Sequence, residues 1–276
     1  MLLDRPHPSN PPPSLRELLI LFLGFITVIA LVVWGLFSLL TALLVWLIPP
    51  QLEAQIGAAV IKEFERQAQP GLIQDKLNEL QDRLEAKQAS QERRDLKVIY
   101  IPEETVNAFA VPGDRIIIFR GLLDYVKSEN ELMMVLGHEI GHFRNRDHLR
   151  GIAQSLTWQI VFAVFFGDNS ILQSIGSVTS AITQSSFSQR QELAADRVGL
   201  DLLVKVYGHA GGAVDFFARL AKAGKSPAVL TFLSTHPHPQ ARVKQLEQII
   251  RRQRYSTQPV LPLPPQLQMS ATNDRK

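Results

Sequence analysis

The apolar positions between residues 131 and 143 recur at spacings of three and four. They are Leu132, Met133, Val135, Leu136, Ile140 and Phe143. This period is typical of a helix with one buried face, so the pattern predicts a helix over Glu131–Phe143. Ser128 is placed to cap the start of this helix, and Glu131 lies three residues later, where it would complete a capping box.

A second apolar pattern is a run from Leu18 to Ile48 that no charged residue interrupts. As a helix it would be about 46 Å long, against about 30 Å for the hydrocarbon core of a bilayer, so one tilted span fits and two do not. A cleaved signal peptide has an apolar core of only about 7–15 residues. We therefore interpret residues 16–50 as an uncleaved transmembrane anchor, with residues 18–48 in the lipid bilayer.

The charges around this run bear on its orientation. Arg5 and Arg16 precede it, whereas Lys62 and Arg66 follow only at some distance. The positive-inside rule then favours a cytoplasmic N-terminus, with the rest of the chain on the extracytoplasmic side. The net charge of +3 gives no indication of nucleic-acid binding, and the absence of cysteine excludes only a disulfide framework.

Three short segments ahead of the predicted helix indicate a small sheet. Leu96–Ile101 and Arg115–Phe119 are rich in β-branched residues and bounded by Pro or Gly, as strands are. Asn107–Val111 between them could form a third segment at an edge. Gln51–Arg94 carries two helical patterns, and further helical patterns follow the predicted helix. The fold class that these patterns predict is α+β, mostly helical, with a small β-sheet.

Composition divides the rest of the chain. Residues 1–15 and 256–276 are Pro-rich and polar, and we expect both to be disordered. Residues 51–255 are enough for one soluble domain with a real core. Within it, we interpret residues 151–186 as a helical hairpin that either lies over the functional site, as a lid or a membrane-dipping segment, or packs as ordinary buried helices.

The candidate chemistry lies inside the predicted helix, at the sequence HEIGH. His138 and His142 are four apart, so both imidazoles can hold one zinc ion, and Glu139 can take a proton from metal-bound water. Two solvated histidines are the alternative, but the apolar neighbours favour the metal because unpartnered buried imidazoles are costly. Gly137 and Gly141 are unfavourable inside a helix by about 1 kcal/mol each, which predicts close approach of another backbone.

A third zinc ligand is available downstream. Glu192 and Asp196 are four apart in the sequence QRQELAAD, which predicts a second helix. Glu192 would bind the zinc, and Asp196 would accept the outer N–H of a zinc-bound histidine. Taken alone, such an acidic pair is typical of a solvated surface, and its coupling to HEIGH favours the ligand interpretation. Other histidines, among them His148 and His209, are expected at the surface.

HEIGH followed by ELAAD resembles the gluzincin metallopeptidases, which include the heat-shock protease HtpX and the CAAX prenyl endoprotease. Two further segments are similar to family motifs: Asn107–Gly113 followed by Gly121–Leu123, and Thr235–Pro239 followed by Arg242. The departures, Val111 and Asp114, supply no chemistry. The resemblance implies a zincin-type metalloprotease domain over residues 51–255, one zinc ion per chain and polypeptide substrates.

The resemblance also implies roles that the residues alone leave open. Asn107, Ala108, Phe109 and Ala110 would hold an extended substrate as an added strand; an ordinary hairpin is the alternative. His236 could be a structural turn residue that caps a following helix, a donor to the oxyanion, or a reversible fourth ligand. Arg242 would brace the local structure.

The function that we expect is that of a membrane-anchored zinc endopeptidase. Its Glu139 would activate a zinc-bound water, and the resemblance implies quality control of misfolded membrane or envelope proteins. The alternatives are a zinc-binding, chaperone-like or autoinhibited binding protein with little proteolysis, and a membrane protein in which HEIGH is coincidental. The sequence predicts no oligomeric state.

Overall fold

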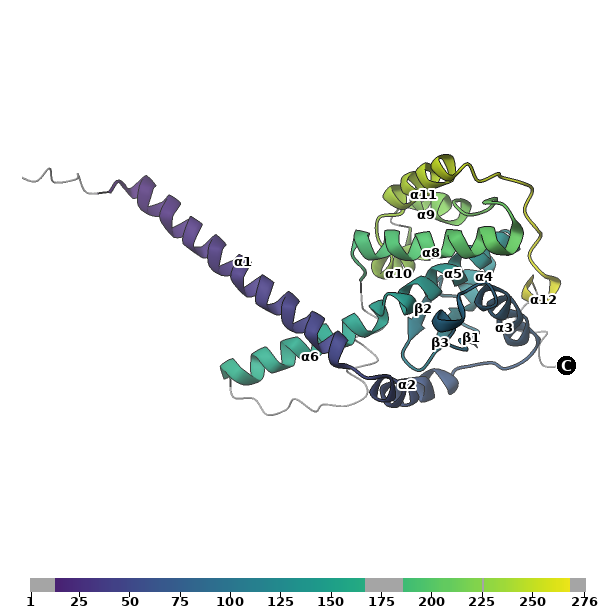
Figure 1. Cartoon of the computed structure of the whole chain (residues 1–276), viewed down its shortest axis with the longest axis horizontal. Coiled ribbons are helices and arrows are strands. Elements are labelled where there is room, and N and C mark those ends of the chain that lie inside the picture. The colour runs from purple at the N-terminus through teal and green to yellow at the C-terminus, as the bar shows by residue number, and fades with distance from the viewer. Residues whose placement is uncertain (1–12, 167–185, 225, 269–276) are drawn as a thin grey trace, which may run out of the picture.

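The computed structural model describes residues 13–166, 186–224 and 226–268 (Figure 1). Its first helix, α1 (Leu15–Leu47), extends away from the rest of the chain as a long rod, capped at its start by Ser14. Among the described residues, α1 is the one helix that is long and apolar enough to cross a membrane. The disorder predicted for residues 1–15 falls mainly on residues 1–12, which lie outside the described residues.

The rest of the described chain is mostly helical with one small sheet, as the apolar patterns predicted. The helices of this part are α2 (Pro50–Glu65), α3 (Leu72–Glu85), α4 (Arg120–Tyr125), α5 (Glu129–Arg144), α6 (Asp147–Phe166), α8 (Gln189–Tyr207), α9 (Asp215–Ala223), α10 (Pro227–Thr235), α11 (Pro239–Gln253) and α12 (Pro265–Gln268). The strands are β1 (Lys97–Ile101), β2 (Ala108–Val111) and β3 (Arg115–Phe119).

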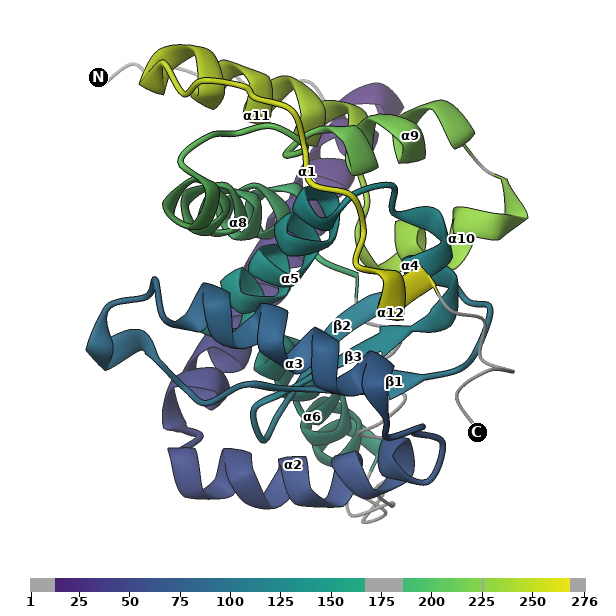
Figure 2. The same ribbon diagram turned by 90° about the vertical axis from the view of Figure 1, so that its right-hand side faces the viewer.

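The sheet has the order β1-β3-β2, with β1 parallel to β3 and β2 antiparallel to it. The predicted edge position of the second segment is therefore confirmed. Successive strand side chains point to opposite faces. Phe109 and Ile117 consequently pack with residues of α2, whereas Ala110 and Ile118 enter the larger core that α3, α5 and α8 share. Figure 2 shows α2 on one side of the sheet and α5 and α8 on the other.

The tail does not match the prediction of disorder. Residues 256–268 run across the domain to α12 (Figure 2), and Leu263 and Leu267 are buried in the main core. The carbonyl of Leu261 accepts a hydrogen bond from the Glu129 amide at 3.0 Å, and the Leu261 amide donates to Asn130 Oδ1 at 2.9 Å. The tail thus satisfies an amide at the start of α5 that the helix itself leaves unpaired. Disorder is wrong for residues 256–268, and residues 269–276 lie outside the described part.

The segment interpreted as a hairpin begins with α6, which runs away from the domain beside α1 (Figure 1). Residues 151–166 therefore do not cover the functional site. They form the outer part of one helix, and Thr41 of α1 lies 3.1 Å from Thr157 of α6, oxygen to oxygen. Residues 167–185, the rest of the predicted hairpin, lie outside the described residues.

The turn between α5 and α6 is tied to the base of α1. Arg146 Nη2 donates to the carbonyl oxygen of Ile48 at 2.8 Å, and His148 Nε2 lies 3.1 Å from Glu53 Oε1. The prediction that His148 lies at the surface is wrong, as it is for His209, because both side chains are buried. The partner of His148 is 95 residues away in sequence, so local patterns give no sign of it.

Candidate metal centre

Helix α5 carries the HEIGH residues through the middle of the core. Its predicted cap is confirmed: Ser128 Oγ accepts from the Glu131 amide at 3.2 Å. The capping box is modified, because the Glu131 carboxylate accepts from the Lys127 amide at 2.9 Å. Every side chain from residue 129 to residue 143 is buried, so His138, Glu139 and His142 are held in a fixed, water-poor position.

The close backbone approach predicted from the two glycines is confirmed, and the partner is α8. A Cβ atom on Gly141 would lie 2.6 Å from the Cα atom of Ala195, and one on Gly137 would lie 2.9 Å from the Cα atom of Gly199. Neither distance is sterically possible without a shift. Glycine therefore brings the two helices close enough for their polar side chains to meet.

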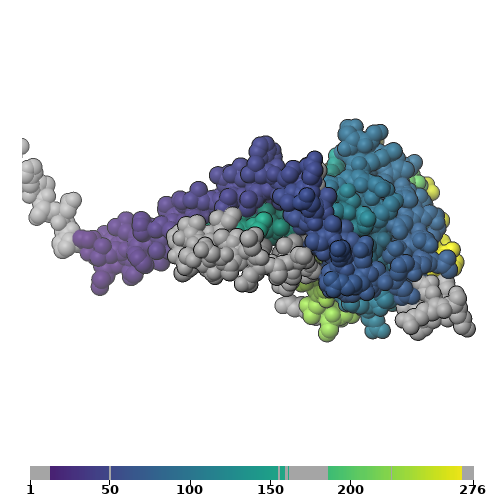
Figure 3. Space-filling view, turned by 90° about the horizontal axis from the view of Figure 1, so that it is seen from below, coloured from purple at the N-terminus to yellow at the C-terminus, as the bar shows by residue number. Residues whose placement is uncertain are grey.

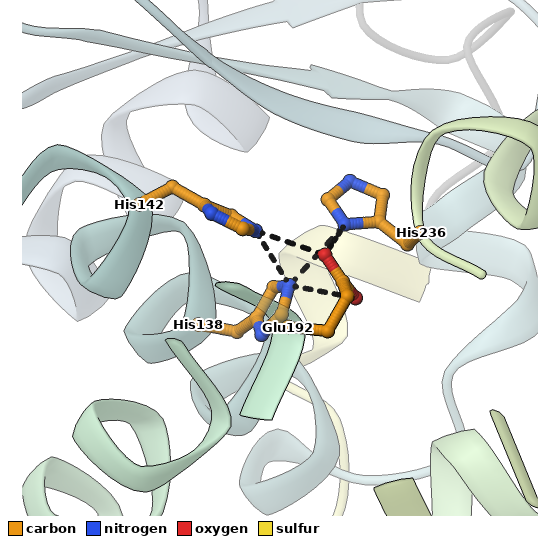
Figure 4. A group of neighbouring side chains, drawn as sticks. All are labelled: His138, His142, Glu192 and His236. Carbon is orange, nitrogen blue, oxygen red and sulfur yellow. Dashed lines mark hydrogen bonds and ion pairs between the residues drawn. The ribbon is translucent and has the colours of Figure 1, made fainter. Parts of the chain in front are cut away.

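The meeting point is a cluster of four buried side chains, two from α5, one from α8 and one from the end of α10 (Figure 4). His138 Nε2 and His142 Nε2 are 3.1 Å apart. Oε1 of Glu192 lies 3.3 Å from His142 Nε2, and Oε2 lies 3.7 Å from His138 Nε2. His236 Nδ1 lies 3.2 Å from both His138 Nε2 and Glu192 Oε1.

These distances suit a tetrahedral cation. Ligand atoms about 2 Å from a central ion are separated by about 3.3 Å along each tetrahedral edge. Five of the distances in the cluster run from 3.1 to 3.7 Å, and the four ligand atoms all lie within 4.8 Å of one another. The donor set of imidazole and carboxylate is also the one that zinc sites use. His236 is the fourth member of the cluster, and a reversible fourth ligand is one of the three roles that the sequence left open for it.

Glu139 lies beside this cluster, and its one ion-pair contact among the described residues is a long one with His236. Its Oε1 atom is 3.8 Å from His236 Nε2, and neither carboxylate oxygen has a hydrogen-bond partner among the described residues. The side chain is fully buried. A buried carboxylate without partners is costly, so this position favours a bound polar species such as water.

Two further predicted residues support the cluster from behind. Asp196 Oδ1 is 2.9 Å from His138 Nδ1, the outer nitrogen of that ring. Arg242 donates to both oxygens of Asp196, at 2.6 and 2.8 Å, and its Nη1 atom is 2.6 Å from Glu192 Oε2. The Arg242 guanidinium also lies 3.9 Å from the centre of the Phe217 ring. The contacts expected for Asp196 and Arg242 are therefore present.

The sequence interpretation missed Asp147, which serves His142 as Asp196 serves His138. Asp147 Oδ2 is 3.0 Å from His142 Nδ1, and Gln191 Nε2 donates to the other carboxylate oxygen at 2.7 Å. Asp147 begins α6 after a turn at Arg146, which has a positive φ of 55°. The available signal was an acidic residue five positions after the second histidine. The contact forms only because the chain reverses its direction at Arg146.

The charges of the cluster are coupled. Burial by itself lowers the pKa of His142, but hydrogen bonds with Asp147 and Glu192 raise it to about 10. Burial raises the pKa of Glu192, but the charge of Arg242 and the nearby imidazoles hold it well below its usual value. The carboxylates therefore favour positive charge at this point, which a bound cation would supply.

Comparison with known proteins places the chain in a family. The model of peptidase family M48 matches residues 69–250, which include the sheet and the whole cluster. The chain belongs to peptidase family M48. Family membership supports the prediction of a metalloprotease, and the buried cluster provides residues that could hold its metal.

The relatives of this M48 chain are proteases of several kinds. It is 34% identical over 153 residues to mitochondrial metalloendopeptidase OMA1 of Arabidopsis thaliana, a match that covers 55% of this chain and 31% of the relative. It is 31% identical over 214 residues to a protease HtpX homolog of Salinibacter ruber, a match that covers 64% of this chain and 75% of the relative. A putative beta-barrel assembly-enhancing protease of Vibrio cholerae is 28% identical over 220 residues, and the match covers 73% of this chain and 44% of the relative. The chain thus spans about a third of OMA1 and three quarters of the HtpX homolog.

Strand β2 of the M48 domain lies next to the metal cluster. His236 Nε2 is 3.3 Å from the carbonyl oxygen of Ala108. Asn107 and Phe109 bond to β3, so the main-chain groups of Ala108 and Ala110 point to the outer side of the strand. The opposite sheet edge differs, because Asn78 Oδ1 and Gln74 Oε1 of α3 accept hydrogen bonds from β1 amides.

Proposed function

We propose that this chain is a zinc-dependent endopeptidase that α1 anchors to a membrane. The observation that carries the proposal is the buried cluster of His138, His142, Glu192 and His236, whose ligand atoms lie within 4.8 Å of one another, with Glu139 beside it and without a hydrogen bond. Family M48 supports the hydrolase class. The zinc itself and the catalytic roles of the residues are inferences from their chemistry and position.

His138, His142 and Glu192 would hold the ion. When bound, zinc would supply a Lewis acid that polarises the scissile carbonyl and makes water acidic. Asp196 and Asp147 keep the two imidazoles in the tautomer and orientation that present Nε2 to the centre, since each accepts a hydrogen bond from an Nδ1–H. Arg242 neutralises the charge of Asp196 and Glu192 behind the site.

Glu139 is the general base in this proposal. Its carboxylate takes a proton from the attacking water and later passes that proton to the leaving amine. Burial without a hydrogen bond suits this role, because a carboxylate held by several donors would keep its charge too firmly to accept the proton. A purely structural metal site would have no use for this residue.

His236 holds a closed state of the site in our proposal. Its Nδ1 atom fills the corner of the tetrahedron where a water molecule would enter, and the four cluster residues are fully buried. The turn-capping alternative is not supported, since the cap of α11 is His238 and no side chain bonds there. We infer that His236 is a displaceable fourth ligand. This closed geometry is also the observation that favours the second candidate, an autoinhibited binding protein with little proteolysis.

The substrate, we infer, binds along β2. The outward groups of Ala110 can pair with an extended peptide as an added strand, whereas side chains of α3 accept from the β1 amides at the other edge. The Ala108 amide donates to Asn107 Oδ1 at 3.0 Å, so a substrate strand would have to replace this contact. His236 contacts the Ala108 carbonyl, so its displacement would free that acceptor at the same time.

The setting of the activity is a proposal as well. The exposed apolar side chains of α1 support a single membrane anchor, and the charges that flank it favour an extracytoplasmic domain. Relatives named HtpX homolog and beta-barrel assembly-enhancing protease suggest misfolded membrane or envelope proteins as substrates.

A degradation assay tests the proposed function. Full-length protein in detergent should cleave an unfolded protein such as casein, lose this activity with a zinc chelator and regain it on zinc addition. Glu139→Gln should keep its zinc yet lose turnover, because only the proton acceptor is removed. Near-wild-type cleavage by this variant would refute the mechanism, and wild-type protein that binds zinc and casein without cleavage would favour the autoinhibited binder.

A further inference from the structure

Helices α1 and α6 enclose a cleft of about 690 Å³ outside the catalytic domain. Most of its lining is apolar and aromatic, with Trp34 and Phe37 from α1 and Trp158 and Val161 from α6. In the space-filling view, α6 shows as a teal surface directly against α1 (Figure 3). The cleft belongs to neither the metal cluster nor the sheet edge.

The two helices are joined as helices in a membrane often are. The buried hydroxyls of Thr41 and Thr157 are 3.1 Å apart, and the rings of Phe37 and Trp158 are 4.8 Å apart between centroids. From residue 151 to residue 166, α6 carries no charge. That length is about 24 Å of helix, enough to enter the hydrocarbon layer beside α1 but not to cross its roughly 30 Å.

Among the described residues that line the cleft, Arg150 is the one cation, and it lies at the end nearest the domain. Arg150 precedes Thr157 by seven residues, which is about 10 Å along the helix. Its Nε atom is buried and has no hydrogen-bond acceptor among the described residues, and the amide of Gln154 lines the same end. A guanidinium at the head of an apolar cleft is complementary to a phosphate with acyl chains attached, because it can bind two phosphate oxygens at once.

We propose that this cleft binds one phospholipid, with its phosphate on Arg150 and an acyl chain between α1 and α6. The inference rests on the proposed membrane anchoring by α1. The lipid would fill the cleft and fix the angle of α6, the helix whose first residue, Asp147, holds His142. Arg150 follows Asp147 by three residues, which is about one helical turn of α6.

Trp158 allows a direct test, because the chain has three tryptophans and only Trp46 lies outside the cleft lining. Full-length Trp34→Phe/Trp46→Phe protein in detergent would be titrated with phosphatidylglycerol brominated on its acyl chains. We expect saturable quenching of Trp158. Arg150→Gln should raise the midpoint at least about tenfold, and the matched charge control Arg252→Gln should not.

A second pair of variants tests the acyl part of the site. Ala30→Phe fills the cleft and should abolish saturable quenching, whereas Ala42→Phe, on α1 but outside the lining, should preserve it. A Trp34→Phe/Trp158→Phe chain, which keeps Trp46, reports contact with bulk lipid.

Three outcomes overturn the proposal. If quenching of Trp158 increases with lipid concentration as that of Trp46 does, and Arg150→Gln leaves its midpoint unchanged, Trp158 contacts bulk lipid only. A Trp158 that stays bright while Trp46 is quenched means that a protein segment covers the cleft. If neither is quenched and alkaline carbonate extracts the full-length protein from membranes, the proposed anchoring itself has failed.

Discussion

Two helix pairs in this chain are packed in opposite ways. α5 and α8 approach through glycine until their backbones touch, and the imidazoles of His138 and His142 on α5 contact carboxylates of α8 across the interface. α1 and α6 touch through one hydroxyl pair and one aromatic pair, and leave an apolar cleft between them. The difference indicates that close approach is needed where polar atoms must be held at bonding distance, and that it is dispensable where two helices meet through apolar surface.

Removing the close approach should have the largest effect. In Gly141→Ala the new Cβ would lie 2.6 Å from the Cα atom of Ala195, so α5 and α8 must separate. We expect a loss of about 1–3 kcal/mol of stability, although alanine by itself favours a helix, and a loss of bound zinc. Gly35→Ala in α1, where no atom lies within 4 Å, is the matched control. Thermal midpoints and metal content would check both; equal behaviour of the two variants contradicts the distinction.

The carboxylates behind the histidines should matter next. Asp196→Asn replaces the charged acceptor for His138 Nδ1 with a neutral amide and weakens the Arg242 pair, so zinc affinity or activity should fall by about 10–100-fold. Asp147→Asn should lower zinc affinity or activity by a similar factor, because Asp147 contacts His142 Nδ1 in the same way. Asp201→Asn, an exposed change on the same helix as Asp196, should have no effect. Zinc titration against a chromophoric chelator would measure the series, and full affinity in Asp196→Asn would contradict the proposed role.

Acid should weaken the link between the anchor and the catalytic domain. Burial raises the pKa of Glu53, but His148 and Arg94 lower it more, to about 2 in the folded chain from 4.5. Because the folded-state pKa is depressed, this carboxylate stabilises the fold above pH 4.5, and the contribution is lost as pH falls towards 2.

Glu53→Gln should therefore be less stable than wild type at pH 7, with a difference that shrinks below pH 4.5. The exposed Glu63→Gln on the same helix should follow the wild-type curve. Thermal midpoints in detergent across this pH range would measure both variants, and a Glu53→Gln deficit that stays constant down to pH 2 would exclude the link.

The smallest effect should come from the contact between α1 and α6. Thr41→Val keeps the shape and removes one hydrogen bond, so we expect a loss below about 1 kcal/mol. Thr27→Val, where the hydroxyl bonds only within α1, is the control. A thermal midpoint shift for Thr41→Val as large as that of Gly141→Ala would show that the two helix pairs are not different in kind.

The sequence patterns correctly predicted those elements whose structure depends on residues close together in the sequence. The helix that carries HEIGH, its Ser128 cap, the three strands and the need for backbone approach at Gly141 all follow from the spacing of residue types. The sequence singled out Glu192 because it pairs with Asp196 at a four-residue helical spacing, and the structure places it within 3.7 Å of both histidines of α5.

The misses concern contacts between distant segments. Asp147 reaches His142 only because the chain reverses at Arg146, and His148 is buried by a carboxylate 95 residues earlier. The composition of the tail predicts disorder, yet Leu263 and Leu267 are buried in the core and the Leu261 carbonyl accepts a hydrogen bond from the Glu129 amide. No periodicity encodes such pairings.

The central claim is that side chains of α5 and α8 converge on one zinc ion. The most direct measurement is the zinc content per chain of purified full-length protein, for wild type and for Glu192→Gln. We predict one zinc ion per wild-type chain and substantially less in the variant. A wild-type chain without zinc, or a variant that keeps all of it, would contradict the claim.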